Sequence, residues 1–297
     1  MATTYSGDVS RLLVLGIKEV MKKLLQAQRT TYFDQYSSKK TSNKLAEYYE
    51  TIGNISPAQI VAEGGQLPYN TISQGYRTTL TNVKVVNGFA VSIETNDDEL
   101  YGAIDEAKVG GLMRTMIGKK ERLVADQWNN TTSYTGADGV ALAATNHPLI
   151  NSTSVNNNYT TGTITPDNVI TAANLFNDIL DQAGELFDTE PTQLLAHKNQ
   201  MARVMAVLES SLKAYELSNT KNTVPALKPV FSKFLDKTKW HLRDETIDSV
   251  VLQERKGLEQ NVEKDAVINY RYLINMIERY CAGTINNGYG FVTSSGV

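Results

Sequence analysis

Apolar residues recur at helical spacing near the start of the chain. In residues 8–29 they are three or four positions apart, and lysines fall mostly between them. Asp8 and Ser10 suit the first turn, where a side-chain oxygen accepts a backbone N–H. This pattern predicts an amphipathic helix. Its apolar face consists of Leu13, Ile17, Val20 and Leu24.

The same period returns in residues 97–128, which we predict to be a second, longer helix. Asp97 and Asp98 lie at its N-terminal end, where the helix dipole favours negative charge. Gly110-Gly111 interrupts the middle, at a cost of about 1 kcal/mol per glycine relative to alanine. The apolar stripe comprises Leu100, Ile104, Ala107, Leu112, Met116 and Val124.

Between the two helices, residues 58–93 have the composition of extended strands. The runs "AQIVAEGG" and "YRTTLTNVKVV" are rich in β-branched residues, and "GGQLPYN" between them has the chemistry of a turn. A long β-ribbon with its tip near residues 64–70 is one prediction. Asn87-Gly88, followed by the alternation of Phe89, Val91 and Ile93, is a second candidate turn. The pattern alone leaves both open.

The second half of the chain alternates short helical and strand patterns. Residues 129–165 are polar, and "TPDN" then begins a helix predicted to continue to Leu180. Another helix is predicted in "KNQMARVMAVLES". No internal repeat is present, so we predict a mixed α+β fold with mostly antiparallel pairing. The predicted strands are "TQLLAH", "KPVFSK", "TKWHLR", "SVVLQER" and "INYRYLINMIERYCAGTI".

Composition and charge exclude several classes of protein. With 297 residues, 41% hydrophobic and 21% charged, the chain has the composition of a globular protein with a substantial core. Its net charge of −3 argues against a protein that coats nucleic acid. The single cysteine, Cys281, excludes an internal disulfide. No segment reaches the roughly 20 apolar residues of a membrane span, and charged residues interrupt any secretory signal.

Charge is distributed unevenly along the chain. Residues 1–44 contain eight Lys and Arg against three Asp and Glu, a net charge of +5. Such a segment is either a solvated helix face or an arm that binds an acidic partner.

Catalytic motifs are missing from the sequence. It contains no phosphate loop, dinucleotide fingerprint, HExxH or GxSxG motif. The histidines at 147, 197 and 241 lie in different predicted elements, and Cys281 has no cationic neighbour in sequence to activate it. We therefore predict no catalytic residue, metal site or cofactor. The 15 tyrosines instead favour extensive protein–protein contact, since tyrosine combines apolar area with a polar tip.

The order of these segments resembles a known family. A helical arm, a ribbon with "IVAEGGQLPYNT", the strand "GFAVSIETNDDELYG", a long helix, "DGVALAATNHPL" and "ALKPVFSKFLDKTKWHLRD" follow one another. This arrangement is similar to the major capsid proteins of tailed bacteriophages, which have the Hong Kong 97-type fold. The resemblance covers nearly the whole chain.

The resemblance implies a division of the chain. It places the ribbon tip at "GGQLPYN", with inter-subunit contacts there, and makes Asn87-Gly88 a kink or bulge in a strand. The contact residues at the tip would be Glu63, Gly64, Gly65, Pro68 and Tyr69. The implied parts are an N-arm (1–52), an extended loop (53–84), a peripheral domain (85–165) with a spine helix (97–128), an axial domain (166–285) with strands returning to the peripheral domain, and a C-terminal segment (286–297).

The loop "DGVALAATNHPL" looks catalytic, because Asp138, Asn146 and His147 lie close together in it. In a capsid subunit it would instead be a structural turn, made by Asp138, Gly139, His147 and Pro148, that folds back along the spine helix. We expect His147→Ala to disturb folding or assembly rather than catalysis.

The implied function is self-assembly, through hexamers and pentamers, into an icosahedral head that encloses double-stranded DNA. The expected partners are other copies of the chain, a portal protein, DNA bound without sequence-specific contacts, and a decoration protein in some particles; no membrane is involved. Because the arm begins almost at Met1, we expect no cleaved pro-region, and a separate scaffolding protein or none. The protein would reside in the virion and assemble in the host cytoplasm. An encapsulin-like nanocompartment shell and a soluble α+β enzyme are the alternatives.

Overall fold

A computed structural model describes most of the chain. The predicted first helix (8–29) lies outside the described residues except for Glu19 and Lys23, which are helical, and the acidic start of the second helix (97–99) also lies outside them. The described residues are 32–52, 58–69, 74–92, 103–150, 155–156, 158–215, 220–265, 271–285 and 289–295, with Glu19, Lys23 and Glu94 individually.

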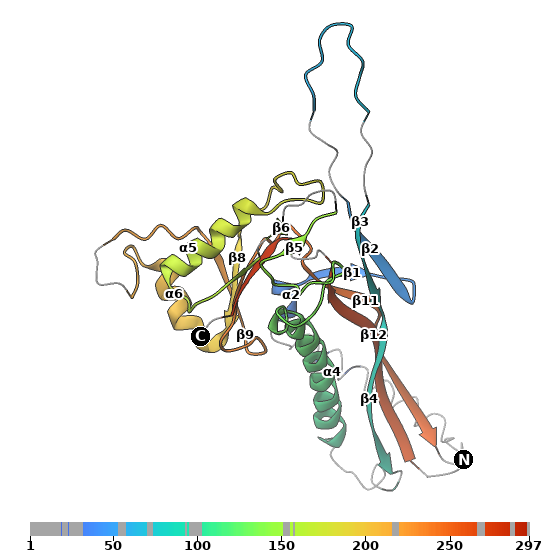
Figure 1. The fold of residues 1–297 in the computed structure, drawn as a ribbon. Coiled ribbons are helices and arrows are strands. Elements are labelled where there is room, and N and C mark those ends of the chain that lie inside the picture. The colour runs from blue at the N-terminus through green and yellow to red at the C-terminus, as the bar shows by residue number, and fades with distance from the viewer. Residues whose placement is uncertain are drawn as a thin grey trace.

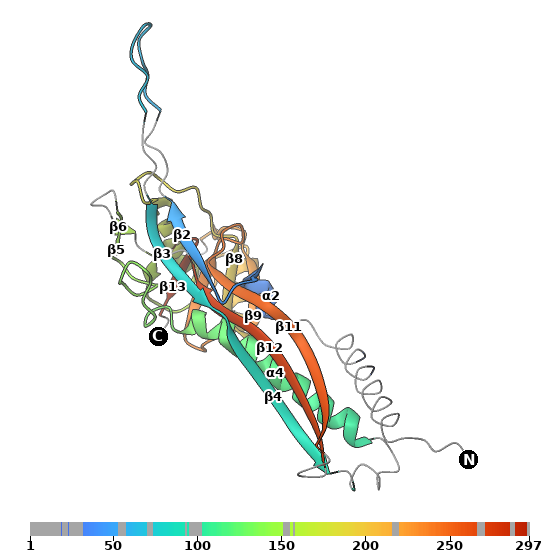
Figure 2. The same cartoon turned by 90° about the vertical axis from the view of Figure 1, so that its right-hand side faces the viewer.

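One half of the fold is a long four-stranded sheet covered by a helix (Figures 1 and 2). The strand order is β1-β11-β12-β4, in which β1 is parallel to β11 and the other pairs are antiparallel. Helix α4 packs along one face, where Met113 and Met116 join Ile274 and Met276 in one cluster. The elements are β1 (Ser38–Thr41), β4 (Val83–Ser92), β11 (Val250–Asp265), β12 (Arg271–Thr284) and α4 (Ala103–Asn129).

The other half is a five-stranded sheet in the order β7-β13-β10-β8-β9. Helices α5 and α6 share a buried cluster with one face of it, including Val169, Val204 and Trp240. The elements are β7 (Tyr159–Thr160), β8 (Gln193–His197), β9 (Lys228–Ser232), β10 (Trp240–Arg243), β13 (Phe291–Ser294), α5 (Pro166–Asn174), η1 (Leu175–Asp178), η2 (Lys198–Gln200) and α6 (Met201–Glu209).

A second buried cluster joins the two halves. Trp128 of α4 contacts the ring of Phe291 at 5.5 Å between centroids, and both side chains are fully buried. The same cluster takes in Phe33 and Tyr36 of the short helix α2 (Phe33–Tyr36). The C-terminal end of α4 is therefore held between the sheets.

A ribbon extends from this body, as Figure 1 shows. Its strands, β2 (Ala46–Ile52) and β3 (Gln74–Thr81), pair antiparallel, so the chain reverses between Ile52 and Gln74. Residues 58–69 contain no strand, and the strand predicted at "AQIVAEGG" was wrong. The first strand of the ribbon lies earlier, at β2, where Glu47 and Glu50 interrupt the apolar residues.

Asn87 and Gly88 lie inside β4 and form no turn. As the resemblance implied, the pair lies within a long strand, and its register with Met276 and Asn275 of β12 is continuous, so the strand has no bulge there. Gly88 is required for close approach instead, because a Cβ there would lie 2.7 Å from the carbonyl oxygen of Ile274. The sheet's irregularity is in β11, where the register shifts between Glu254 and Glu259.

Most predicted elements in the second half are confirmed. Helix α5 starts as "TPDN" predicts: Thr165 accepts a hydrogen bond from the Asn168 amide, and proline occupies the first turn. It ends at Asn174 rather than Leu180, and the 3₁₀ helix η1 follows. All five predicted strands are present, at β8, β9, β10, β11 and β12. The short strands β1 and β13 were not predicted. β5 (His147–Pro148) and β6 (Val155–Asn156) complete the described strands.

Two glycines give matched tests of this packing. Gly88→Ala places a methyl group against the β12 backbone and is expected to lower the free energy of unfolding by about 1–3 kcal/mol. Gly111→Ala, in α4, meets nothing within 4 Å and is expected to raise it by about 0.5–1 kcal/mol. Urea unfolding of unassembled subunits measures both, and equal effects from the two substitutions would contradict the register at Gly88.

Candidate functional site

The three histidines do not form a site. His147 lies on β5, His197 on β8 and His241 on β10. Among the residues that the structure describes, no group of three or more His, Cys, Asp or Glu side chains is arranged to hold a metal ion. The structure thus gives these residues separate surroundings.

Two groups that could act as a base or a nucleophile are buried in unreactive states. His241 is fully buried, and burial, with a smaller contribution from Lys239, lowers its pKa to about 3. Burial also raises the pKa of the Cys281 thiol to about 11, so the thiolate is scarce at neutral pH. Neither group is ready for acid–base or nucleophilic chemistry.

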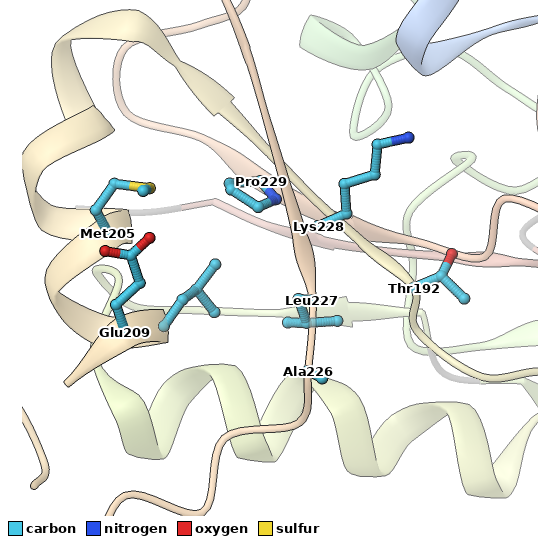
Figure 3. Close-up of a pocket in the computed structure, with 8 residues that line it drawn as sticks. Thr192, Met205, Glu209, Ala226, Leu227, Lys228 and Pro229 are labelled. Carbon is cyan, nitrogen blue, oxygen red and sulfur yellow. The ribbon is translucent and has the colours of Figure 1, made fainter. Parts of the chain in front are cut away.

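A hollow of about 450 Å³ lies between α6 and the start of β9 (Figure 3). Its charged groups, Glu209 and Lys228, point away from each other in the close-up, and much of its lining is apolar. A catalytic pocket needs polar groups that converge on one point. The hollow is lined by Thr192, Met205, Leu208, Glu209, Ala226, Leu227, Lys228 and Pro229.

The loop "DGVALAATNHPL" contains a buried polar network. His147 Nδ1 lies 2.5 Å from Asp138 Oδ2, its Nε2 lies 3.1 Å from Asn158 Oδ1, and both side chains of the His147–Asp138 pair are at most 2% exposed. The Asn158 side chain is fixed in turn, because it accepts from the Ala144 amide and donates to the Leu142 carbonyl. These side-chain hydrogen bonds all join residues between 138 and 158.

The local backbone explains why this loop folds as it does. Gly139 has φ +82°, a left-handed conformation that glycine adopts without strain, and the Val140 amide donates to Asp138 Oδ1. The loop then returns to the end of α4, where the Ala143 amide donates to the Thr131 carbonyl at 2.8 Å. Pro148 pairs with Val155 in the small β5–β6 sheet. The four residues assigned to the turn therefore lie together around a buried hydrogen-bond network.

A buried carboxylate ties the N-terminal part of the chain to α4. Glu121 accepts hydrogen bonds from the backbone amides of Tyr32 and Phe33, at 2.6 and 3.1 Å, and from the Tyr36 hydroxyl at 3.1 Å. Burial raises the pKa of Glu121, although these hydrogen bonds favour its ionised form. Two turns further along α4, the Trp128 indole donates to the Tyr36 carbonyl at 3.1 Å. Residues 32–36 are thus held at a fixed position.

Sequence reasoning missed the role of Glu121. A glutamate within a helix usually faces solvent, and its partners lie more than 80 residues earlier in the chain. The only available signal was its place three residues before Val124, a spacing that puts it beside the apolar stripe of the helix.

The end of the ribbon exposes apolar side chains to solvent. Ile60 is fully exposed, Tyr69 is 90% exposed and Leu67 is 65% exposed. Figures 1 and 2 show this segment far from either sheet. Single exposed apolar side chains are normal, but several large ones exposed on one segment are typical of an interaction surface.

The predicted tip residues all lie on this exposed end. Glu63 and Gly64 form a turn, Gly64 has φ +79°, and the Gly65 amide donates to the Ala62 carbonyl at 2.9 Å. Pro68 and Tyr69 continue the exposed stretch. The structure brings these residues together within one chain, and their assignment to an inter-subunit contact stays a prediction.

No known family profile and no curated protein sequence matches this chain. Among the described residues, no helix is both long enough and apolar enough to cross a membrane. Solved structures do match. The chain is similar to the capsid structure of the cyanophage P-SCSP1u, with 13% identity, a TM-score of 0.62, and coverage of 91% of this chain and 89% of that one.

Two further structures are similar over nearly their full lengths. A chain from Microbacterium phage Oxtober96 has 11% identity and a TM-score of 0.58, with 90% and 91% of the two chains covered. The virus-like particle from Pyrococcus furiosus has 12% identity and a TM-score of 0.52, with 94% and 97% covered. At these identities the likeness is one of fold: the protein has the α+β Hong Kong 97-type capsid fold, as its order of segments suggested.

The pKa shift of Glu121 predicts a pH dependence. Because its folded-state pKa is raised, the folded protein binds more protons than the unfolded chain just above the ordinary glutamate range, so this group's contribution to stability falls as pH rises through that window. Glu121→Gln removes the titration. We therefore expect the free energy of unfolding of the variant, relative to that of wild type, to increase as pH rises from about 5 to about 8. Urea unfolding across this range measures it.

Tyr36→Phe is the matched control for Glu121→Gln. It deletes one hydrogen bond to the same carboxylate, at roughly 1–3 kcal/mol, while the titrating group stays in place. The control should keep a pH dependence of the same sign as wild type, extended to higher pH, because the lost hydrogen bond favoured the ionised carboxylate. If the free energies of unfolding of Glu121→Gln and wild type changed with pH in parallel, the raised pKa of Glu121 would be contradicted.

His147→Ala tests whether the turn is structural. The change leaves the Asp138 carboxylate buried without its partner and is expected to cost about 3–5 kcal/mol. Asn146→Ala, at the exposed neighbouring position, should change stability by less than about 0.5 kcal/mol. Urea unfolding compares the two, and an enzymatic activity lost in His147→Ala without loss of stability would overturn the structural role.

Proposed function

We propose that this chain is the major capsid protein of a tailed bacteriophage, which self-assembles into an icosahedral shell around double-stranded DNA. The observation that carries the proposal is the ribbon, whose end exposes Ile60, Leu67 and Tyr69 on a fold shared with phage capsid proteins. The function is structural, in keeping with a fold seen in capsid neighbours and with the separate, unreactive surroundings of the candidate groups above.

Self-association is what the ribbon's surface favours physically. Full burial of one Ile, Leu or Tyr side chain stabilises a contact by roughly 1.5–3 kcal/mol. The ribbon lies too far from its own sheets to bury these side chains there, so another molecule must cover them. A second copy of the chain is the partner that a shell supplies at every position. Two further exposed tyrosines, Tyr48 on β2 of the ribbon and Tyr215, suit contacts of the same kind.

The parts of the chain then take distinct roles. Residues 53–84 would reach over a neighbouring subunit, with Glu63, Gly64, Gly65, Pro68 and Tyr69 at the contact. Residues 166–285 would form most of the axial domain and residues 85–165 the peripheral one, with residues 1–52 as an arm and 286–297 as a C-terminal segment. Different patches meeting head to tail close into rings, which gives the hexamers and pentamers of an icosahedral shell.

Other partners follow from this role. We propose a portal protein at one vertex, DNA held without sequence-specific contacts, assembly in the host cytoplasm and, in some particles, a decoration protein. The net charge of −3 suits a container whose DNA must leave, because a strongly basic wall would retain it. The +5 segment at residues 1–44 would recruit an acidic scaffolding protein.

A nanocompartment shell is the second candidate, favoured by the similarity to the virus-like particle from Pyrococcus furiosus. The two candidates share subunit contacts and differ in shell size and contents. A soluble enzyme has no comparable support, since the hollow beside α6 lacks convergent polar groups.

The decisive test is size-exclusion chromatography with light scattering, followed by negative-stain imaging of the largest species. We expect rings of five and six 32.8 kDa subunits, or closed shells. Nucleic acid in shells produced with the packaging machinery would identify a virus head, and a protein cargo would identify a nanocompartment. A monomer or dimer that persists at high concentration, with scaffold added, would overturn both.

Ile60→Asp with Tyr69→Asp serves as the control. The two exposed changes should leave urea unfolding of the subunit unchanged and abolish shell formation, because charged side chains cannot be buried at an apolar contact. Shell formation at the wild-type concentration by this variant would argue against the ribbon as a contact.

A further inference from the structure

Charge is segregated between the two ends of the five-stranded sheet. β8 and β9 are parallel and start at the same end, where antiparallel β10 finishes. A five-residue strand is roughly 16 Å long, so the two ends are well separated. We call the end that holds residues 181–192 and 244–248 the acidic end, and the end that holds residues 198–203 and 233–239 the basic end.

The acidic end contains seven Asp and Glu in its two segments. Two of these acids pair with lysines that lie beside them: Glu245 with Lys228, the first residue of β9, at 3.7 Å, and Asp248 with Lys40 at 2.7 Å. Its segments are joined by hydrogen bonds: the Thr189 hydroxyl and the Glu190 amide both donate to the Asp244 carboxylate, at 3.1 and 3.2 Å. Glu185, Asp188 and Glu190 are exposed, and they form no ion pair with other described residues. Their charges are therefore directed at solvent.

The basic end contains five Lys and Arg and one acid, Asp236. Lys198 directly follows β8 and Lys233 directly follows β9, while Lys237 lies in the turn before β10. All three side chains belong to exposed residues without an ion pair among those described. The Gln200 amide donates to the Lys237 carbonyl, which holds the two segments of this end together.

We propose that the acidic end of one copy binds the basic end of the next copy in a head-to-tail ring. This inference rests on the proposed self-assembly and names the surfaces that meet. A ring of identical subunits needs two different, complementary patches on each, and opposite charges fixed at opposite ends of one rigid sheet meet that requirement.

Each end also offers an exposed apolar residue. Leu186, between Glu185 and Asp188, is 71% exposed, and Met201, the first residue of α6, is 45% exposed. An apolar contact inside a charged rim is the usual build of a protein interface. The charges then select the partner and its direction, while Leu186 and Met201 supply burial.

DNA is the other candidate partner for the basic end. It does not account for the acidic end, which would repel DNA, and it leaves Leu186 uncovered. A second copy accounts for both ends with one contact.

Charge reversal in complementary pairs tests the contact. One variant carries Glu185→Lys and Glu190→Lys, and another carries Lys233→Glu and Lys237→Glu. Counted over the exposed residues named above, the first variant changes the acidic end from −3 to +1 and the second changes the basic end from +3 to −1. The exposed charges at the two ends of each variant then have the same sign, so we expect each alone to need at least roughly tenfold more protein to assemble than wild type at 0.1 M salt. Salt at 1 M, where the Debye length falls to about 3 Å, should reduce the difference.

Mixing the two variants is the decisive step. Unlike ends meet again when the variants alternate, and alternation closes only in rings with an even number of subunits. We expect the mixture to form six-membered rings without five-membered ones, and a chain carrying all four changes to form both. Light scattering and negative-stain imaging distinguish these species.

Glu259→Lys with Glu263→Lys, on exposed positions of β11, is the control with the same change of charge, and it should assemble as wild type does. Variants that assemble at the wild-type concentration, or a mixture that assembles no better than its components, would overturn the contact. If the basic-end variant assembled normally and lost only DNA retention, the basic end would be assigned to DNA binding, and the proposed contact between copies would be overturned. Failure of wild type itself to assemble would instead count against the proposed function.

Discussion

The packing of Trp128 at the C-terminal end of α4 is the contact on which the rest of the structure depends. The fully buried indole lies against Phe291 and His241, with ring centroids 5.5 and 5.2 Å away, and its N–H is bonded to Tyr36. It thereby joins the five-stranded sheet, the helix that covers the four-stranded sheet and the segment that leads to the ribbon. Loss of a buried tryptophan side chain typically costs about 3–5 kcal/mol, and here three parts of the fold would lose their common support.

This junction gives the ribbon a fixed starting point. Glu121 and Trp128 fix residues 32–36, and the base of the ribbon packs on the four-stranded sheet through Leu80 and Tyr49, so the exposed end extends from a rigid base. The short strand β1 then adds to β11 and carries the chain into β2. A rigid base lowers the conformational entropy lost when the ribbon's end is covered by another molecule.

The polar groups of the interior are neutral or paired, whereas the surface exposes apolar and charged side chains without partners in the described chain. Inside, histidine, cysteine and carboxylate groups are buried in states that suit folding: His241 neutral, Cys281 protonated, and Asp138 paired with His147. Outside, the ribbon exposes apolar side chains, and the five-stranded sheet keeps charges of opposite sign at opposite ends. A subunit that assembles with its own copies requires this division, because its folding must be complete before its contacts are made.

The sequence by itself determined the local elements whose patterns are strong. Thr165, Pro166 and Asn168 set the start of α5, and apolar spacing set the course of α4 through Gly110 and Gly111. The order of segments was enough to indicate the fold, and Gly64 and Gly139 do occupy turns with positive φ. These features depend on residues near one another in the chain, which a pattern can show.

Only the tertiary structure decided the rest. The first strand of the ribbon is Ala46–Ile52 because β3 pairs with it, while the more apolar run at residues 58–65 stays unpaired. Gly88, which reads as a turn residue, is needed because the β12 backbone passes beside it. Glu121 and the two charged ends of the five-stranded sheet depend on residues tens of positions apart. Their significance comes from strand register and long-range burial, which sequence spacing does not encode.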